Sequence, residues 1–424
     1  MGNLDYTQVL NKIENTRRFG NEPGVVVTAQ VIKLLREKGK QKRIIPYIHV
    51  AGTNGKGSVC AFFSSILKKE HMRVGTFVSP HLVDFEERIT VDGRMIPKED
   101  VTRLGNYLLD IDFGIGLTMF DYCLAMALLY FEEQQCDYMV IETGLGGRLD
   151  STNAIGTPQC AVITKIGYDH MAILGSDIAD IAAEKAGIIK ENGTVVVEQQ
   201  DKRAMQVIEQ EVKKKHARII TVEQSDIARC SGYALRLCGT FQWENAAAAE
   251  LAARYVLGKR YSGPEYEMQY DKTEPKSEKT DLNDRIKSAL EETVWPGRME
   301  IVSKEPFLLV DGAHNSNGVD ALKESLMQMY PGEKFCFFMG VMADKDYDVM
   351  IREILPLAEE FYTVTPDSDR ALQASHLADF IRKEGVCATE LSGVDEIRKH
   401  LKRDTKNVAF GSLYFIGELK QHRI

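Results

Sequence analysis

IIPYIHVAGTNGKGS, residues 44–58, is the stretch that decides the fold of the first part of the chain. An apolar, β-rich run ends in a loop where Gly52, Gly55 and Gly57 surround Lys56, and a helix-like segment, SVCAFFSSILKK, follows at once. Glycines let the backbone turn tightly, so several N–H groups can face one anion, and the N-terminus of a helix attracts negative charge. The stretch therefore predicts a phosphate-binding loop between a strand and a helix.

The loop is not spaced like the common phosphate loop G-x-x-x-x-G-K-[ST]. Only two residues separate Gly52 from Gly55, and a further glycine stands between Lys56 and Ser58. A plain strand–turn–helix corner that uses glycine for positive φ would explain the glycines alone. It would not explain the lysine and the hydroxyls: Lys56 can reach terminal phosphates, and Thr53 or Ser58 can meet a metal ion.

Length and composition exclude several classes of protein. With 424 residues the chain is too long for one ordinary core, which predicts two or three domains. The net charge of -9 argues against a nucleic-acid binder, because no basic stripe is present to release counterions. The N-terminus has no apolar signal region, and the longest apolar run, residues 122–131, is half the length that spans a bilayer. We expect a cytoplasmic monomer without membrane or nucleic-acid partners.

The cysteines point to a reducing compartment. None of the eight shows metal-ligand or redox spacing, and most lie inside apolar runs. This pattern predicts buried free thiols.

Apolar, strand-like runs alternate with helical patterns from Ile44 onward. The runs cover residues 44–50, 74–78, 138–142, 160–166 and 193–198. Such alternation predicts an α/β fold, a P-loop-type domain whose mostly parallel sheet is covered by helices on both faces. Two short helices, over residues 5–16 and 24–38, are expected before it. Ligands then belong in the crevice at the carboxyl ends of the strands.

A second, smaller α/β unit is predicted from Trp295 onward. Its strand-like runs cover residues 307–311, 335–340, 361–365 and 407–411, and helices are expected to start near residues 318, 374 and 413. Before it, residues 259–284 are polar and poor in aliphatics, which predicts a surface insertion without chemistry. We therefore expect a large domain over residues 1–296 and a small one over 297–424.

Polar residues follow several of the expected strands. Glu142 ends the run DYMVIE beside a glycine-rich loop, and Asp169 and His170 follow CAVITKIGY. Ser79 ends the strand after the phosphate-loop helix. A strand-end Glu can equally cap the next segment, and an isolated Asp-His pair is more often a satisfied loop histidine. Together with the phosphate loop, these residues favour a shared Mg²⁺ site.

Lys185 lies in SDIADIAAEKAGIIK, an expected helix whose apolar stripe includes Ile181. The spacing of four residues places the lysine on or beside the buried side. A lysine that only extends its head to solvent would fit the same pattern. A buried lysine must instead be paired or neutral.

The second unit carries its own strand-end motifs. WPGRME supplies Arg298, and LLVDGAHNSNG supplies Asp311 and His314, while GVMADKDYD and GSLYF have similar placements. Each motif is unspecific alone. Together they favour a site for a second substrate or for the base and ribose of a nucleotide.

The series of motifs resembles one family. HVAGTNGKGS, SPHL with EERI, ETGLGGRLDSTN, DHMAILG, AAEKAGIIK, WPGRME, DGAHN, ADKDYD and GSLYF occur in the order seen in folylpolyglutamate synthases and dihydrofolate synthases. These enzymes belong to the Mur ligase superfamily of ATP-dependent amide ligases. The resemblance runs from RRFGNEPG to the C-terminus.

The resemblance implies an ATPase and folate-binding domain followed by a Rossmann-like domain. It implies that L-glutamate is joined to a folate with ATP and Mg²⁺, through an acyl phosphate. It further implies a carbamylated Lys185, and a monovalent cation is a further candidate. The chain departs from the family pattern at Asp121, where glutamate is frequent, and at Lys165, where serine is frequent.

Site residues are carried over by the resemblance onto matching positions. The expected catalytic residues are Lys56, Lys185 and His170. The expected ATP contacts are Thr53, Asn54, Gly55, Lys56, Gly57, Ser58, Asn245, Arg298, Asp311 and His314. The expected metal ligands are Ser58, Ser79, Glu142, His170 and Lys185. Folate is expected at Thr118, Phe120 and Asp121, and glutamate at Ser412 and Tyr414.

Two other functions remain open from the sequence. The chain could act on dihydropteroate as a dihydrofolate synthase, alone or with both activities. It could also be a P-loop nucleotide switch, which would use the same phosphate loop. A muropeptide ligase is disfavoured, because about 45 residues before the loop are too few for a separate nucleotide-binding domain.

Overall fold

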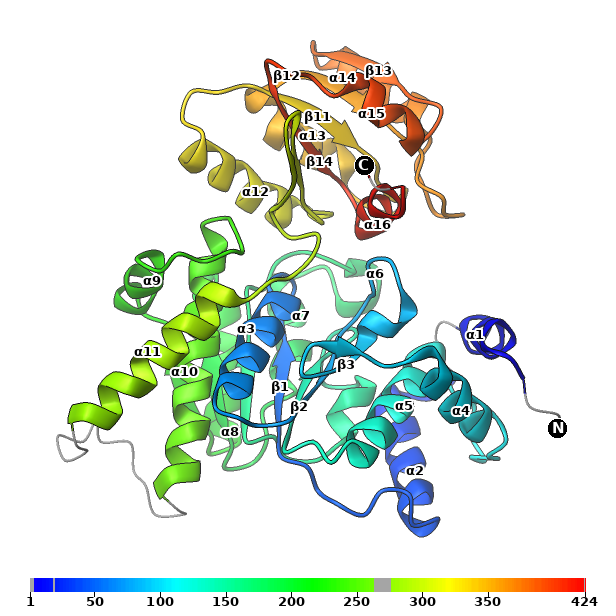
Figure 1. Ribbon diagram of the computed structural model, residues 1–424, viewed down its shortest axis with the longest axis vertical. Coiled ribbons are helices and arrows are strands. Elements are labelled where there is room, and N and C mark those ends of the chain that lie inside the picture. The colour runs from blue at the N-terminus through cyan, green and yellow to red at the C-terminus, as the bar shows by residue number, and fades with distance from the viewer. Residues whose placement is uncertain (1–3, 18–19, 263–275, 423) are drawn as a thin grey trace. The chain divides into compact units, whose positions relative to one another are not determined.

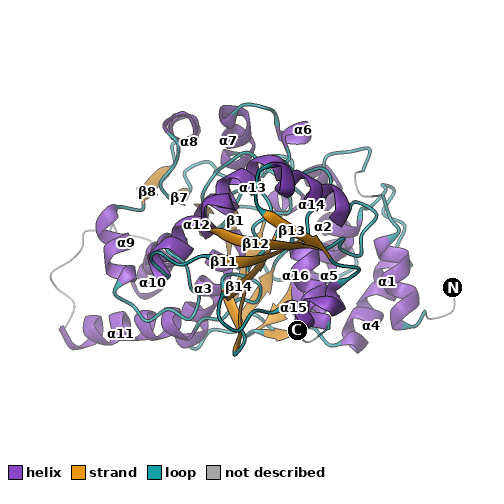
Figure 2. Cartoon of the chain, turned by 90° about the horizontal axis from the view of Figure 1, so that it is seen from above, coloured by secondary structure: helices purple, strands orange, loops and turns teal. Residues whose placement is uncertain are grey.

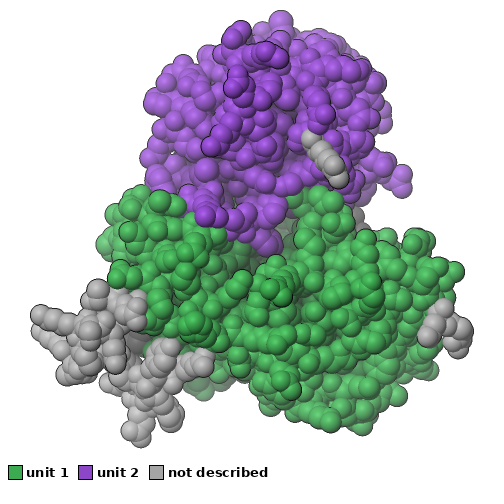
Figure 3. All heavy atoms as spheres, viewed as in Figure 1, with its two compact units in different colours: residues 1–234, 244–293 green, residues 235–243, 294–424 purple. Residues whose placement is uncertain are grey.

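The computed structural model describes residues 4–17, 20–262, 276–422 and 424, which form two compact units (Figure 3). Unit 1 comprises residues 1–234 and 244–293, and unit 2 comprises residues 235–243 and 294–424. The expected boundary at residue 296 lies close to this division. However, residues 235–243 were expected in the first domain. They belong to unit 2, where Phe241 packs on the core and the Thr240 N–H donates to Ser325 Oγ at 3.0 Å.

Unit 1 is built on one eight-stranded sheet with the order β4-β3-β2-β5-β1-β6-β7-β8. Its strands pair in parallel except at one edge, where β3 pairs antiparallel with both β2 and β4. All residues of the central strand β1 are buried, as a parallel strand covered on both faces requires. The strands are β1 (Tyr47–Ala51), β2 (Val74–Phe77), β3 (Ile89–Val91), β4 (Arg94–Met95), β5 (Tyr138–Glu142), β6 (Cys160–Ile163), β7 (Thr194–Val197) and β8 (Arg218–Thr221).

Helices cover both faces of this sheet (Figures 1 and 2). α3 contacts β1, β2 and β5 and is covered by α11, whereas α5 packs on β2 and β3 and is itself contacted by α2 and α4. α5 begins at a capping box, in which the side chains of Thr118 and Asp121 each bond the backbone N–H of the other residue. The helices of this unit are α1 (Tyr6–Glu14), α2 (Gly24–Glu37), α3 (Lys56–Lys69), α4 (Lys98–Leu109), α5 (Met119–Glu133), α6 (Met171–Leu174), α7 (Ile178–Ala186), α8 (Lys202–Lys214), α9 (Gln224–Ser231), α10 (Phe241–Ser262), whose first three residues belong to unit 2, and α11 (Lys276–Glu292).

Unit 2 has a six-stranded sheet with the order β13-β12-β11-β14-β10-β9. All its strands pair in parallel except β9, which is antiparallel to β10. In the core, Phe337 stacks on Phe361 with ring centroids 5.3 Å apart and meets Phe410 edge-on at 5.6 Å. The elements are β9 (Glu300–Lys304), β10 (Phe307–Val310), α12 (Ser316–Met329), β11 (Phe335–Met339), α13 (Tyr347–Ile354), β12 (Ala358–Thr363), α14 (Ala374–Lys383), β13 (Cys387–Glu390), α15 (Ile397–His400), β14 (Lys406–Phe410) and α16 (Leu413–Gln421).

The predicted fold class, two α/β units with mostly parallel sheets, is confirmed. The segment 259–284 was expected to be a surface insertion, but its two ends are helical, in α10 and α11, and residues 263–275 lie outside the described residues. The thiols are free: Cys387 is exposed and Cys238 partly so, while the others are buried. No helix in the described ranges is long and apolar enough to cross a membrane.

Candidate active site

The loop after β1 has the geometry of a phosphate cradle. Gly52 and Gly55 have φ values of 156° and 90°, and Gly55 is the N-cap of α3. The Lys165 carbonyl oxygen accepts the N–H groups of Thr53 at 2.9 Å and Asn54 at 3.2 Å, which fixes the first half of the loop. The start of α3 leaves its first N–H groups without carbonyl partners inside the helix, so they are available to an anion.

Asn245, from α10, packs directly on this loop. A Cβ atom at Gly55 would lie 2.3 Å from the Asn245 Oδ1 atom, and the asparagine is only 3% exposed. The expected ATP residues Asn54, Gly55 and Asn245 are therefore brought together in unit 1.

Gly55→Ala is expected to raise the KM for ATP at least about tenfold, because the buried amide of Asn245 cannot move away without displacing the loop. Steady-state kinetics of ATP consumption measure the change. Gly385→Ala is the matched control, since Gly385 has the same φ of 90° but no atom within 4 Å of its added Cβ. The control should lose about 1–2 kcal/mol of stability and keep its KM. An unchanged KM in Gly55→Ala would contradict the phosphate-loop assignment.

Lys56 and Glu142 face each other across the ends of neighbouring strands. The Lys56 Nζ atom lies 3.8 Å from a Glu142 carboxylate oxygen and donates to the carbonyl oxygen of Gly52 at 3.2 Å. The backbone N–H of Ser79 donates to the other Glu142 oxygen at 3.2 Å. Three expected site residues from the ends of β1, β2 and β5 are thus adjacent.

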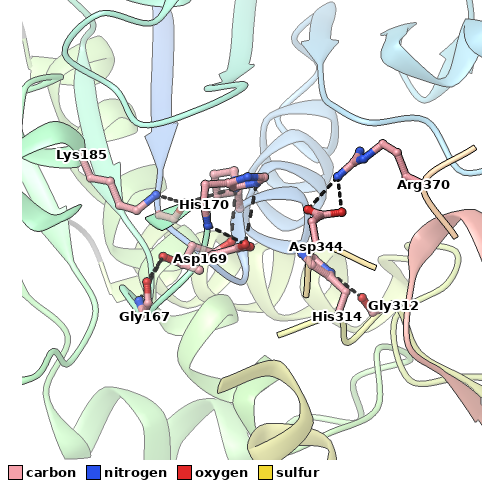
Figure 4. Close-up of polar contacts among 11 residues, drawn as sticks. Gly167, Asp169, His170, Lys185, Gly312, His314, Asp344 and Arg370 are labelled. Carbon is pink, nitrogen blue, oxygen red and sulfur yellow. Dashed lines mark hydrogen bonds and ion pairs between the residues drawn. The ribbon is translucent and has the colours of Figure 1, made fainter. Parts of the chain in front are cut away.

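His170 follows β6, on the other side of β1. Its φ of 52° is unusual for a non-glycine residue, and its backbone N–H donates to the Asp169 carboxylate at 2.8 Å (Figure 4). The imidazole side chain is 36% exposed, so it is accessible to a ligand.

These residues fit a Mg²⁺ ion whose coordination shell is completed by substrate phosphates. In the part of the chain that the structure describes, no three His, Cys, Asp or Glu side chains gather closely enough to enclose a metal ion by themselves. Mg²⁺ usually binds through one or two carboxylates together with waters and substrate phosphates. Glu142, 4% exposed at a strand end beside the phosphate loop, and the hydroxyls of Ser58 and Ser79 provide a donor set of that type.

Lys185 is buried beneath the same loop. It is 4% exposed, and its Nζ atom donates to the Gly52 carbonyl oxygen at 2.8 Å (Figure 4). Burial, and then the charge of Lys56, lower the pKa of Lys185 to about 7, although Asp169 and Asp150 act in the opposite direction. The expectation of a buried position is confirmed, and a lysine with its head in solvent is excluded.

The carboxylate of Asp121 is not placed for the direct contact with folate that had been expected from the sequence. It is 2% exposed, one carboxylate oxygen accepts the Ser151 hydroxyl at 2.6 Å, and the other accepts the N–H and hydroxyl of Thr118. It therefore ties α5 to the glycine-rich loop rather than facing a ligand. Phe120 packs on Phe77 with ring centroids 5.4 Å apart and also against Gly144.

Two residues that bond the phosphate loop or its neighbour Lys165 were not predicted from the sequence. The Thr164 hydroxyl donates to the Asn54 carbonyl oxygen at 2.7 Å, and Glu198 accepts the Lys165 N–H at 2.8 Å. Glu198 directly follows β7 and is 1% exposed, and burial raises the pKa of its carboxyl group well above the ordinary value. A strand-end acid was the available signal, and it was used at Glu142 but not at Glu198.

Unit 2 gathers its expected residues at the ends of β10 and β14. The Asp311 carboxylate, 4% exposed, accepts the N–H groups of Met299 and Ala313 at 2.8 Å each. Burial raises the pKa of Asp311, against the nearby charge of Arg298. The Nδ1 atom of His314 is hydrogen-bonded to the carbonyl oxygen of Gly312, two residues before it, at 2.8 Å (Figure 4).

The two residues expected to bind glutamate follow β14. Ser412 is the N-cap of α16, and its hydroxyl oxygen accepts the Phe415 N–H at 3.1 Å. Tyr414 is 53% exposed. Ser412 therefore already has a structural contact, whereas Tyr414 is accessible to a ligand.

Comparison with known proteins decides the family. Residues 50–253 match the Mur ligase middle domain, and residues 297–411 match the Mur ligase glutamate ligase domain. The dihydrofolate synthase/folylpolyglutamate synthase of Bacillus subtilis is 33% identical, over 98% of both chains. The chain belongs to the Mur ligase family. The resemblance to its folylpolyglutamate and dihydrofolate synthase members is thereby confirmed.

Solved structures of Mur ligases agree with this assignment. The folylpolyglutamate synthase of Mycobacterium tuberculosis, complexed with ADP and AMPPCP, has a TM-score of 0.83 and 25% identity, and covers 99% of this chain and 98% of its own. The E. coli FolC structure with DHPP and ADP has a TM-score of 0.80 and 26% identity, over 99% of this chain and 97% of its own. This Mur ligase therefore shares the fold of those enzymes over 99% of its length.

Proposed function

We propose that the chain is an ATP-dependent ligase that joins L-glutamate to a folate. The observation that carries the proposal is the convergence on one carbonyl: Lys56 and Lys185 both donate to the Gly52 oxygen, and Glu142 lies 3.8 Å from Lys56. A nucleotide switch needs the phosphate loop but not a second, fully buried lysine beneath it. The relatives named above are synthases of folylpolyglutamate and dihydrofolate.

The reaction begins on the phosphate loop. The N–H groups at the start of α3 bind the phosphates, and Lys56 offsets the charge that develops on the transferring γ-phosphoryl group. A folate carboxylate oxygen attacks the γ-phosphorus, ADP leaves, and an acyl phosphate forms. The glutamate amine then attacks the acyl carbon, phosphate leaves, and the amine loses a proton. Holding these substrates in line is the main work of the protein.

Mg²⁺ is proposed at Ser79, Glu142 and His170, with Ser58 as a further ligand. When bound, it would neutralise phosphate charge during transfer. Lys185 would contribute to a second Mg²⁺ only as a carbamate. The neutral amine attacks the carbon of CO₂ and loses a proton, which converts a buried cation into an anion. No residue is assigned to the monovalent cation expected from the resemblance.

The remaining contacts are proposed from the resemblance to the family. Folate is assigned to the start of α5, where Thr118 and Phe120 are partly exposed and Asp121 holds them in place. Arg298, Asp311 and His314 are assigned to the nucleotide. Ser412 and Tyr414 are assigned to glutamate. A monomer remains our expectation.

Dihydropteroate is a second candidate substrate. The B. subtilis relative carries the names of both synthases, which favours a bifunctional enzyme. Mass spectrometry of folate products tests the proposal. Tetrahydrofolate incubated with ATP, Mg²⁺ and L-glutamate should gain the mass of whole glutamyl residues, and samples without ATP should not. Hydrolysis of ATP with no change in folate mass would contradict it.

A further inference from the structure

Arg88 is a buried arginine that has no carboxylate partner among the described residues. It is 8% exposed and ends the short 3₁₀ helix Phe85–Arg88, just before β3. Buried arginines are ordinarily paired with a carboxylate, and even the partly buried Arg285 pairs with Glu70. Over the described ranges, the only side-chain bond of Arg88 is the one from Nε to His81 Nδ1 at 2.8 Å, and it forms no ion pair.

The bond fixes the state of His81. Arginine can only donate, so Nδ1 of His81 accepts and its proton lies on Nε2. The bond uses only the Nε donor of Arg88, so the remaining guanidinium N–H groups and the imidazole Nε2–H of His81 are left to bind another group.

The position of the pair connects it with the site. The Arg88 carbonyl oxygen accepts the Val78 N–H at 3.0 Å, one residue before Ser79, which in turn bonds Glu142. On the other side, the charge of Arg88 acts on the buried thiol of Cys123, opposing the rise of its pKa to about 11. Cys123 lies in the first turns of α5, close to Phe120. The backbone of Arg88 is thus bonded to the end of β2, and β3, which starts directly after Arg88, contacts α5.

We propose that Arg88 binds the carboxylate of the terminal glutamyl residue of folate that is not being activated, and that His81 orients its guanidinium group. The inference rests on the proposed function and names a specificity residue for it. A folate ends in two carboxylates: one must attack the γ-phosphate, and the other stays anionic and must be neutralised. Arginine suits this task because its planar donors match a carboxylate. Dihydropteroate has only the first carboxylate, so Arg88 favours substrates that already carry glutamate.

The test compares two ligands that differ by this carboxylate. Tetrahydrofolate carries both, whereas tetrahydropteroyl-γ-aminobutyrate keeps only the one that is activated. Wild-type protein with Mg²⁺ and a non-hydrolysable ATP analogue should bind tetrahydrofolate about 10- to 100-fold more tightly by calorimetry. Equal affinity of the wild-type protein for the two ligands would overturn the inference, whatever the variants do.

Arg88→Gln should weaken tetrahydrofolate binding by the same factor and leave the analogue unaffected, while Arg88→Lys should restore part of the difference. Arg103→Gln is the control, because Arg103 is a surface residue paired with Asp100 and Glu133 and should change neither affinity. Equal weakening of both ligands in Arg88→Gln would assign a merely structural role. Failure of the proposed function would be distinct: the wild-type enzyme would then bind neither ligand.

Discussion

Lys185→Met is expected to lower turnover at least about a hundredfold while it raises the stability of the protein. The amine lies under the phosphate loop, where it is positioned to act on the transferring group either directly or as a carbamate. The loop itself should survive the substitution, because the Gly52 carbonyl oxygen also accepts Lys56 at 3.2 Å. Kinetics and thermal unfolding measure the two effects. Near wild-type turnover in Lys185→Met would contradict the catalytic assignment.

The gain in stability should depend on pH. The pKa of Lys185 is about 7 in the folded protein, against 10.5 as its ordinary value. Between these values the unfolded chain binds more protons, so the penalty for burying the lysine is complete below about pH 7 and fades as pH rises toward 10.5. Lys185→Met should therefore exceed wild type in stability by more at pH 6.5 than at pH 9. Lys190→Met, which also removes a partly buried lysine, is the control for activity and should retain turnover.

The same variant tests the carbamate. Wild-type enzyme prepared in CO₂-free buffer should lose activity and regain it when bicarbonate is added, whereas Lys185→Met should respond to neither. Wild-type activity that is indifferent to CO₂ would leave Lys185 acting as an amine.

Lys56→Gln is expected to lower kcat/KM for ATP by roughly 10²- to 10³-fold, because it removes the cation closest to the developing phosphoryl charge. It also leaves the carboxylate of Glu142, 4% exposed, without its partner at 3.8 Å. Steady-state kinetics at varied ATP measure the loss.

Lys69→Gln is the matched control for Lys56→Gln. Lys69 ends the same helix and pairs with Glu292 on the surface, so its loss should leave kcat/KM within about twofold. If Lys56→Gln behaved like this control, the phosphates would have to bind elsewhere.

Much of the fold followed from local pattern. Apolar runs with glycine-rich ends placed β1, β5, β6 and β10, because parallel strands buried on both faces show continuous apolar sequence. The strands at the edges of the two sheets, β3, β4, β8, β9 and β13, were missed, since short edge strands bury little. The assignment of residues 235–243 to unit 2 could not be predicted either, because it depends on contacts between Phe241 and residues far along the chain.

The site divides in the same way. The positions of Lys56, Glu142 and Lys185 followed from strand ends and helix spacing, and their functional roles remain predictions. The bonds of Asp121 could not be predicted, because a capping acid and a ligand-binding acid look alike in sequence. Arg88 was quoted only as part of a motif. Its importance depends on the fact that no described carboxylate pairs with it, and only the three-dimensional structure shows this.

Phosphate release from Mg-ATP is the measurement that tests the central claim most directly. It should be compared with tetrahydrofolate and with dihydropteroate, each with and without L-glutamate. We expect release that requires both L-glutamate and tetrahydrofolate, and additional release with dihydropteroate would mark a bifunctional enzyme. Release that is indifferent to the pterin and to glutamate would contradict the ligase and favour a nucleotide switch.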